Sequence, residues 1–249
     1  MFTPKERARL RSDLIEFARQ DARIAAGALT GSASADREDQ WSDIDLAFGL
    51  ADVAEMPNVL SDWTARMYER HSAVHHFDVK AGAWIYRVFL LASTLQVDLA
   101  FVPAAEFGAL APTFRLLFGQ ANDPGHAPPQ PTGDLIGMGL LYALHARSSI
   151  ARGRVWQAEL MISCLRDNAL ALACIRHELP AAHGRGFDQL PGAVIAQFED
   201  SLVRSLEPVQ LADAFRAAAR AFSSEIEHTD PQLAKRLEPI LASLIAISQ

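Results

Sequence analysis

The sequence predicts an α+β protein with an N-terminal mixed β-sheet domain with flanking helices and a C-terminal all-α helical bundle domain. Short runs typical of strands dominate as far as Pro103. The stretch 119–133, GQANDPGHAPPQPTG, is rich in Pro and Gly, which bar regular structure. Long segments with helical periodicity come after it. We therefore expect domains at 1–118 and 134–249, joined by a linker at 119–133.

The overall composition limits the possible partners. The chain has 249 residues, half of them hydrophobic, and 23 basic against 30 acidic residues give a net charge of −7. This acidity argues against general binding to the phosphates of nucleic acid. We find neither a signal peptide nor an apolar run of membrane-spanning length, so we expect a cytoplasmic protein with no membrane partner. The oligomeric state cannot be predicted from the sequence.

The first predicted helix begins at Thr3-Pro4-Lys5-Glu6, where Thr3 and Glu6 form a capping box and Pro4 suits the first helical turn. Apolar residues then recur at helical spacing, so one face of this helix packs on the sheet. We expect its basic residues, Arg7 among them, to form a solvated face. A strand at 24–29 follows.

The middle of the first domain contains a second helix and three further strands. Ser61 or Asp62 is a candidate cap for a helix that runs to about Glu69. Tight breaks between the strands predict antiparallel hairpins. The expected strands are 74–79, 85–91 and 95–102.

Helical segments follow one another beyond Gly133, separated by short loops. Such loops predict an up-and-down bundle, because consecutive helices then lie antiparallel. The expected helices are 134–150, 154–177, 194–202, 208–222 and 230–247.

Two carboxylates, Asp43 and Asp45, stand one residue apart in an apolar run. On a strand they share one face, while Ile44 and Leu46 point into a core. Adjacent like charges destabilise a protein unless a positive charge lies between them. Mg²⁺ prefers oxygen ligands and is commonly held by one or two carboxylates plus substrate phosphates. The pair therefore predicts a magnesium site.

Gly31 and Ser32 directly follow the strand at 24–29. Glycine lets the backbone turn sharply and approach a ligand closely. The serine hydroxyl and the N–H groups of a following helical turn can bind phosphate. The stretch thus predicts a phosphate cradle beside the metal site. A further acid, Asp98, lies alone on the 95–102 strand, on the face opposite Val97.

These residues resemble the signature of the nucleotidyltransferase superfamily (DNA polymerase β-like), namely Gly-Ser, a spacer of about ten residues, then Asp-x-Asp or Asp-x-Glu on a strand. The chain supplies Gly31 and Ser32, then Asp43 and Asp45. The resemblance covers residues 27–103 and is closest to two-domain antibiotic nucleotidyltransferases acting on aminoglycosides and lincosamides. The family usually has a third carboxylate on a later strand, as Asp98 is here.

One departure affects the phosphate contacts. Many members carry Arg-x-Gly after the Gly-Ser, whereas this chain has Ser34-Ala35-Asp36. Arg37 is the candidate to replace the missing charge.

The resemblance implies Mg²⁺-dependent transfer of a nucleoside monophosphate from an NTP, such as ATP, to a hydroxyl of a small molecule, with release of pyrophosphate. An antibiotic-like acceptor would make the protein a resistance enzyme. Asp43 and Asp45 would hold Mg²⁺, and Ser32 with the N–H groups near Gly31 would hold the terminal phosphates. Asp98 would complete a second metal site or orient the acceptor.

Asp98 and Glu159 are both candidates for the general base that takes the proton of the acceptor hydroxyl. In some resembled enzymes a glutamate on a second-domain helix takes the hydroxyl proton, and Glu159 lies on such a helix here. Glu159 is otherwise an ion-pair partner of Arg166 or Arg152, or a plain surface acid. Tyr142 and His145, on the preceding helix, are weaker candidates for substrate contact.

Two other functions stay open at this point. A protein-modifying nucleotidyltransferase of the antitoxin type is one, although those proteins are usually a single minimal domain. A non-catalytic nucleotide-binding module is the other, and the three intact acids count against it.

Overall fold

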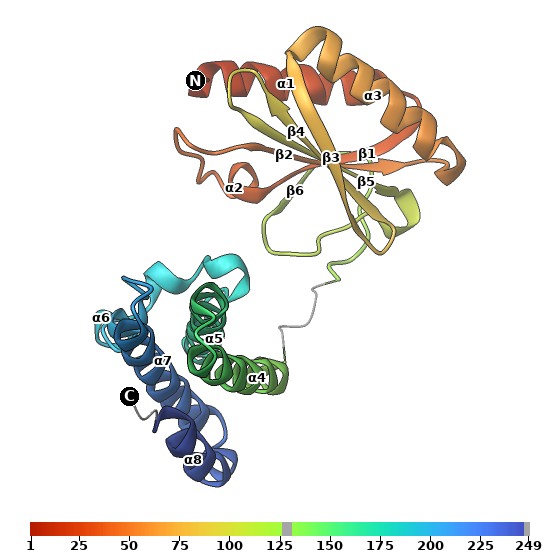
Figure 1. Cartoon of the computed structure of the whole chain (residues 1–249). Coiled ribbons are helices and arrows are strands. Elements are labelled where there is room, and N and C mark those ends of the chain that lie inside the picture. Colours follow the sequence, from red (N-terminus) through yellow and green to blue (C-terminus); the bar gives the residue numbers. More distant parts are fainter. Residues whose placement is uncertain (126–130, 247–249) are drawn as a thin grey trace. The chain divides into compact units, whose positions relative to one another are not determined.

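The computed structural model describes residues 1–125 and 131–246 (Figure 1). The chain divides into two compact units, Met1–Pro128 and Pro129–Gln249. The first contains a mixed sheet with helices and the second is helical, which confirms the predicted α+β class. The centre of the predicted linker, residues 126–130, lies outside the described residues, so its role as a linker stays a prediction.

Six strands in the described part of the first unit form one sheet in the order β3-β4-β5-β2-β1-β6. β2 and β5 run parallel, and the other neighbours run antiparallel. The strands are β1 Ile24–Thr30, β2 Ile44–Leu50, β3 Ala73–Ala81, β4 Trp84–Leu91, β5 Gln96–Pro103 and β6 Phe114–Phe118.

Two long helices, α1 Pro4–Gln20 and α3 Met56–His71, lie on the same face of this sheet (Figure 1). Their buried side chains pack on the inward residues of β2 and β5. Trp63 of α3 is fully buried, and its ring centroid lies 4.9 Å from that of Phe48 and 5.6 Å from that of Phe101. Truncating such an aromatic side chain costs about 3–5 kcal/mol of stability.

The predicted start of α1 is confirmed. Thr3 is the N-cap, its hydroxyl accepts from the backbone N–H of Glu6, and the Glu6 carboxylate accepts in return from the backbone N–H of Thr3. The Thr3 hydroxyl and backbone N–H both donate to the Glu6 carboxylate, and these bonds lower the pKa of Glu6 below its usual range.

The opposite face of the sheet has a smaller core with a floor of small residues. Ala28, Ala47 and Ala100 are buried there, together with the aromatic rings of Trp84 and Phe107. Because alanine side chains are short, the core on this face is thin. The larger aromatic side chains at its margin project further from the sheet.

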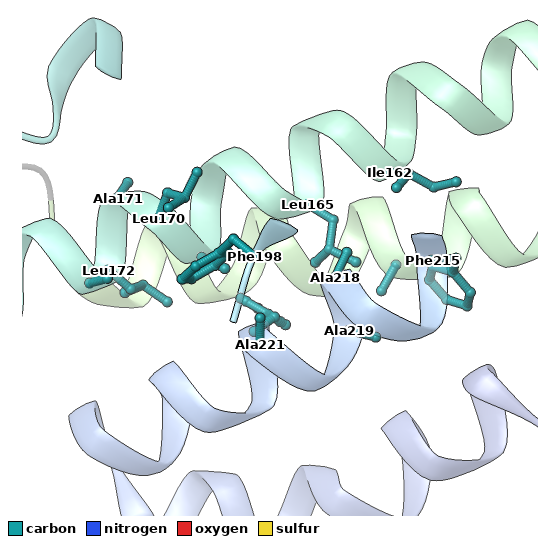
Figure 2. Packing of buried hydrophobic residues seen from close by; sticks show 14 of the residues in the cluster. Ile162, Leu165, Leu170, Ala171, Leu172, Phe198, Phe215, Ala218, Ala219 and Ala221 are labelled. Carbon is teal, nitrogen blue, oxygen red and sulfur yellow. The ribbon is translucent and has the colours of Figure 1, made fainter. Parts of the chain in front are cut away.

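The second unit contains four long helices among its described residues. Buried side chains of α5, α7 and the 198–201 region, among them Leu165, Phe198 and Phe215, interdigitate in its core (Figure 2). The nearly fully buried Glu225 accepts from Nε and Nη2 of Arg176, at 3.0 and 2.7 Å, and so ties α7 to α5. The long helices are α4 Thr132–Ala151, α5 Val155–Arg176, α7 Pro208–Thr229 and α8 Pro231–Ile245.

Three predicted helices differ from the structure, and among them α7 continues to Thr229 instead of ending at 222. α3 starts at Met56 rather than at Ser61, because Pro57 fits its first turn and a short turn, capped by Asp52, leads into it. The predicted 194–202 helix is wrong beyond Ile195. Only one α-helical turn, α6 Gly192–Ile195, forms. A short 3₁₀ helix, Glu199–Ser201, follows it, with Phe198 and Ser201 buried. Tertiary packing has overridden helix propensity here.

β6 was not predicted. Its sequence, Phe114–Phe118, is a short apolar run interrupted by Arg115, and it forms an edge strand. Beyond it, the backbone of Asn122 bonds to Phe107 and that of Gly125 to Ala109, so the first residues of the predicted linker are attached to the first unit. Among the described residues, no helix is long and apolar enough to cross a membrane.

Candidate metal and phosphate site

The three predicted acids converge on the face of the sheet opposite α1 and α3. Asp43 immediately precedes β2, Asp45 is on β2 and Asp98 on β5. The parallel pairing of β2 with β5 places Asp45 directly opposite Asp98. One carboxylate oxygen from each acid lies within 4.8 Å of the other two, and all three residues are half-buried. Ile44 and Leu46 are buried on the other face, as the alternation predicted.

The arrangement fits a hard divalent cation. Three carboxylates at this separation offer oxygen ligands only, and the partial exposure of each leaves room for water or phosphate oxygens to complete the shell. A cation between the three carboxylates would offset the repulsion of their like charges. The chain could therefore bind Mg²⁺ at Asp43, Asp45 and Asp98.

The surroundings of Asp98 raise the pKa of its carboxyl. Burial, together with the nearby charge of Asp43, raises this pKa to about 6. Gln96 opposes both effects by donating from its side-chain amide to the two Asp98 oxygens, at 3.0 and 3.2 Å. Asp98 therefore exchanges a proton close to neutral pH.

Gly31 and Ser32 follow β1 in the short helix α2, Gly31–Ser34, as predicted. Gly31 has φ +59°, and a Cβ there would lie only 1.9 Å from Oδ2 of Asp45. Two reasons therefore favour glycine at this position: its backbone φ is positive, and any side chain would clash with the Asp45 carboxylate. This contact places the predicted phosphate cradle directly against the acid cluster.

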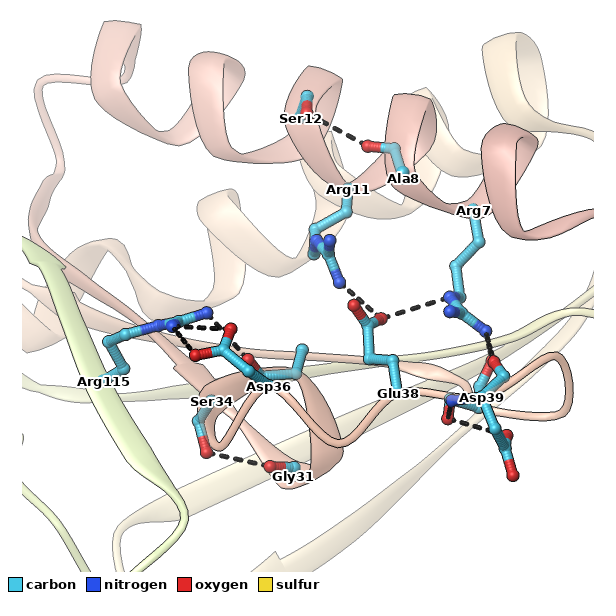
Figure 3. Close-up of polar contacts among 12 residues, drawn as sticks. Arg7, Ala8, Arg11, Ser12, Gly31, Ser34, Asp36, Glu38, Asp39 and Arg115 are labelled. Atoms are coloured by element: carbon cyan, nitrogen blue, oxygen red, sulfur yellow. Dashed lines mark hydrogen bonds and ion pairs between the residues drawn. The ribbon is translucent and has the colours of Figure 1, made fainter.

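The turn that follows α2 is hydrogen-bonded to Arg115 of β6. Asp36 has φ +53°, a conformation that favours glycine, and it stands where the resembled family has one. Arg115 donates from Nη1 to the Asp36 carboxylate, at 2.9 and 3.0 Å, and from Nη2 to the carbonyl of Ala33 at 2.8 Å (Figure 3). Arg37 is exposed, and its backbone N–H donates to the carbonyl of Ser32.

Arg7 was expected on a solvated face, and this prediction is wrong. It is only 4% exposed and reaches from α1 to the loop that precedes the acids. Its Nη1 donates to the carbonyls of Asp39 and Ser42 at 2.6 and 2.9 Å, and its Nε pairs with Glu38 at 3.1 Å (Figure 3). Arg7 therefore positions the backbone directly before Asp43.

The remaining candidates lie in the second unit, so their roles stay predictions. Glu159 is half-buried on α5 and accepts from the Ser163 hydroxyl at 2.9 Å. Arg166, one of its suggested partners, pairs with Asp167 instead. On α4, Tyr142 is half-buried and His145 is exposed.

Three contributors were missed from the sequence: Arg7, Gln96 and Arg115. Only Gln96 carried a signal, because it shares a strand face with Asp98 two residues away. The two arginines reach the site from distant parts of the chain, and no local pattern indicates such contacts.

Fold and site together define a two-unit α+β protein with a carboxylate cluster beside a Gly-Ser turn. No family model matches the sequence, and no curated protein matches it. Among solved structures, the chain is similar to the crystal structure of an aminoglycoside 6-adenyltransferase from Bacillus subtilis, with 13% identity and a TM-score of 0.36. The match covers 94% of this chain and 96% of the other.

Proposed function

We propose that the protein is a nucleotidyltransferase that moves a nucleoside monophosphate from an NTP to a hydroxyl of a small molecule. The observation that carries this proposal is the contact of Gly31 with Asp45 within a cluster of three carboxylates. A phosphate-binding turn against a divalent-cation site is what a magnesium–triphosphate complex requires.

Asp43, Asp45 and Asp98 would hold Mg²⁺ and so orient the triphosphate for in-line attack. The cation, when bound, offsets the negative charge that develops on the transferring phosphoryl group. Arg7 contributes indirectly, because its bonds to the Asp39 and Ser42 carbonyls fix the backbone from which Asp43 projects.

The Gly31–Ser34 turn would hold the terminal phosphates through the Ser32 hydroxyl and backbone N–H groups. Arg37, whose side chain is exposed beyond this turn, would add positive charge, and Arg115 braces the turn through the carbonyl of Ala33. Ser34 braces the turn by donating from its hydroxyl to the carbonyl of Gly31 at 2.8 Å.

In the transfer step, the acceptor oxygen forms a bond to the α-phosphorus. The bond from that phosphorus to the bridging oxygen breaks, and pyrophosphate leaves. The hydroxyl proton passes to a carboxylate, either Asp98 or Glu159.

The acceptor we propose is a hydroxylated antibiotic-like molecule of the aminoglycoside or lincosamide type. Modification of a protein hydroxyl and nucleotide binding without catalysis are the alternatives. The second unit counts against the first, since a minimal protein-modifying enzyme needs no such bundle. The conjunction of three carboxylates with the turn counts against the second.

The test is pyrophosphate release from each NTP with Mg²⁺, measured against a panel of aminoglycosides and lincosamides. We expect release that depends on NTP, Mg²⁺ and acceptor together. Ser32→Ala should weaken NTP binding by about 1–3 kcal/mol, the value of a hydrogen bond to a charged group, with little effect on acceptor binding. Ser12→Ala, on the exposed side of α1, is the matched control. Unchanged NTP affinity in Ser32→Ala would remove Ser32 from the cradle.

A further inference from the structure

The strand β3 stands at one edge of the sheet, where it pairs with β4 alone. Alternate residues of a strand direct their backbone N–H and C=O groups to the same side. One side of β3 therefore presents backbone groups that no strand among the described residues pairs with. Its side chains are open as well, because only Ala73 of its nine residues is buried. This edge is thus available to a further strand.

The edge of β3 has little of the protection that edge strands commonly carry. Proline, charged side chains and bulges usually prevent such a strand from pairing. β3 contains no proline, and its one register irregularity lies at its start, between Ala73 and His75. Phe77 and Val79, near its middle, are 52% and 49% exposed. A long, apolar and exposed edge strand favours pairing with another chain.

The sequence of β3 fits an antiparallel copy of itself. In a pair centred on Phe77, all nine residues of one strand lie opposite residues of the other, beginning with Ala73 opposite Ala81. Phe77 then faces its own counterpart, and aromatic pairs across strands are favourable. Two apolar contacts flank this pair, because Val79 of each copy lies opposite the ring of His75 from the other.

The charged side chains of β3 favour the same register. On the face opposite Phe77, this pairing places His76 of one copy opposite Asp78 of the other, a basic side chain facing an acidic one. Arg87 donates to Asp78 from Nε and Nη2 at 2.7 and 2.8 Å, and a carboxylate can accept further bonds. Centring the pair on Asp78 would set two carboxylates directly opposite each other, which is destabilising. Centring it on His76 would leave the last two residues of the strand without partners.

We propose that β3 pairs antiparallel with β3 of a second copy of this chain, in the register centred on Phe77, and so joins two sheets into one. The inference concerns assembly. It goes beyond the proposed nucleotidyl transfer and does not depend on it.

The row of residues that crosses the sheet from Phe77 leads to the acid cluster. Phe77 lies opposite Val88, Val88 opposite Asp98, and Asp98 opposite Asp45. Paired residues share a face of the sheet, so Phe77 stands on the face that carries the acids. Two identical antiparallel strands are related by a two-fold axis perpendicular to their sheet, and both copies then turn this face to the same side. The two Asp98 residues would lie five strand spacings apart, a distance of about 24 Å.

The mass of the full chain in solution, measured by sedimentation velocity without nucleotide or metal, tests the proposal. We expect the parent to sediment as a dimer at micromolar concentration. Phe77→Asp places two carboxylates on the two-fold axis and should raise the Kd of the dimer at least tenfold. Leu116→Asp makes the same kind of change at an exposed position on β6, the opposite edge of the sheet, and should sediment like the parent.

Phe77→Cys tests the register without adding a charge. Residues directly opposite in an antiparallel pair have Cα atoms about 4.5–5.5 Å apart, within the range of a disulfide. Mild oxidation should therefore link Phe77→Cys chains into covalent dimers. In Val79→Cys the new thiol lies opposite His75 of the other copy, so the two thiols should not be linked. The parent, which keeps its free Cys164 and Cys174, is the control for oxidation.

Three results would overturn the inference. The first is a parent chain that sediments as a monomer. The second is a dimer that Phe77→Asp leaves intact, because another surface would then join the copies. The third is a dimer in which Val79→Cys forms the disulfide and Phe77→Cys does not, which would refute the register.

Discussion

Gly31 and Asp45 form the closest link between the two halves of the candidate site, since a Cβ on Gly31 would lie 1.9 Å from Oδ2 of Asp45. We expect Gly31→Ala to displace that carboxylate and to strain the backbone at φ +59°, at a cost of more than about 1 kcal/mol. Mg²⁺ affinity, measured by calorimetry, should fall. Gly82→Ala is the matched control, because Gly82 has φ +61° but no atom within 4 Å of a Cβ. Equal Mg²⁺ affinity in the two variants would refute the link.

Asp43→Asn and Asp45→Asn should each abolish Mg²⁺-dependent transfer while the chain stays folded. Without metal, both variants should melt at or above the parental temperature, because like-charge repulsion is relieved. Asp188→Asn makes the same charge change at an exposed position in the second unit and should leave activity unchanged. Near-normal turnover of either site variant at saturating Mg²⁺ would show that the carboxylates hold no essential cation.

The raised pKa of Asp98 predicts a pH dependence of stability. The folded pKa, about 6, exceeds the ordinary 3.8, so the folded state binds this proton more tightly than the unfolded state. The resulting stabilisation is fully present below about pH 4 and is lost as the pH rises through 6. Relative to Asp98→Asn, the metal-free parent should lose about 1–3 kcal/mol of unfolding free energy between these values. Denaturant unfolding at stepped pH measures this difference, and parallel profiles would contradict it.

Protonation of Asp98 competes with the binding of Mg²⁺ to its carboxylate. Mg²⁺ affinity should rise as the pH increases through about 6 and level off above it, because the cation requires the ionised carboxylate. Calorimetric titration between pH 5 and 8 tests this, and an affinity independent of pH over that range would exclude Asp98 as a ligand.

Arg7 is expected to act as a positioning residue. Arg7→Gln removes the bonds that hold the carbonyls of Asp39 and Ser42, so the segment before Asp43 should loosen and Mg²⁺ affinity should fall severalfold. Binding is measured well below the melting temperature, which separates this effect from unfolding. Arg9→Gln, at an exposed position on the same helix, should bind Mg²⁺ like the parent. A loss of stability with unchanged Mg²⁺ affinity would reduce Arg7 to a structural role.

Glu159→Gln distinguishes the two candidate bases. The substitution keeps the size of the side chain and removes its basicity, so the chemical step should slow by about 10²–10⁴ if Glu159 takes the proton. NTP affinity should change little. Glu238→Gln, exposed on α8, is the control. Normal single-turnover rates in Glu159→Gln would assign the base to Asp98.

Much of the first unit could be predicted because its signals are local. The alternation of acidic and apolar residues around Asp43 and Asp45 predicted β2 and its buried face. The capping box of Thr3 and Glu6 predicted the start of α1. Gly31-Ser32 predicted a sharp turn, and Gly31 there has φ +59° and no room for a Cβ beside Asp45.

What could not be predicted depends on contacts distant in sequence. The local sequence does not distinguish Arg7 from the exposed basic residues of α1. Arg7 is buried because the 38–42 loop packs on it. β6 is too short to stand out, and Arg115 interrupts its apolar run, yet the strand completes the sheet. A cavity beside Asp45 and Asp98 forms only because Trp84 and Tyr86 of β4 and residues 108–114, distant in sequence, line it together.

The parallel pairing of β2 with β5 has a kinetic consequence. Asp45 and Asp98 meet only after the chain has formed α3, β3 and β4 and returned to the centre of the sheet. Such a non-local pairing closes late, because loop entropy must first be overcome. A cation that needs both acids therefore has no site in a partly folded sheet, and it should slow unfolding rather than accelerate folding.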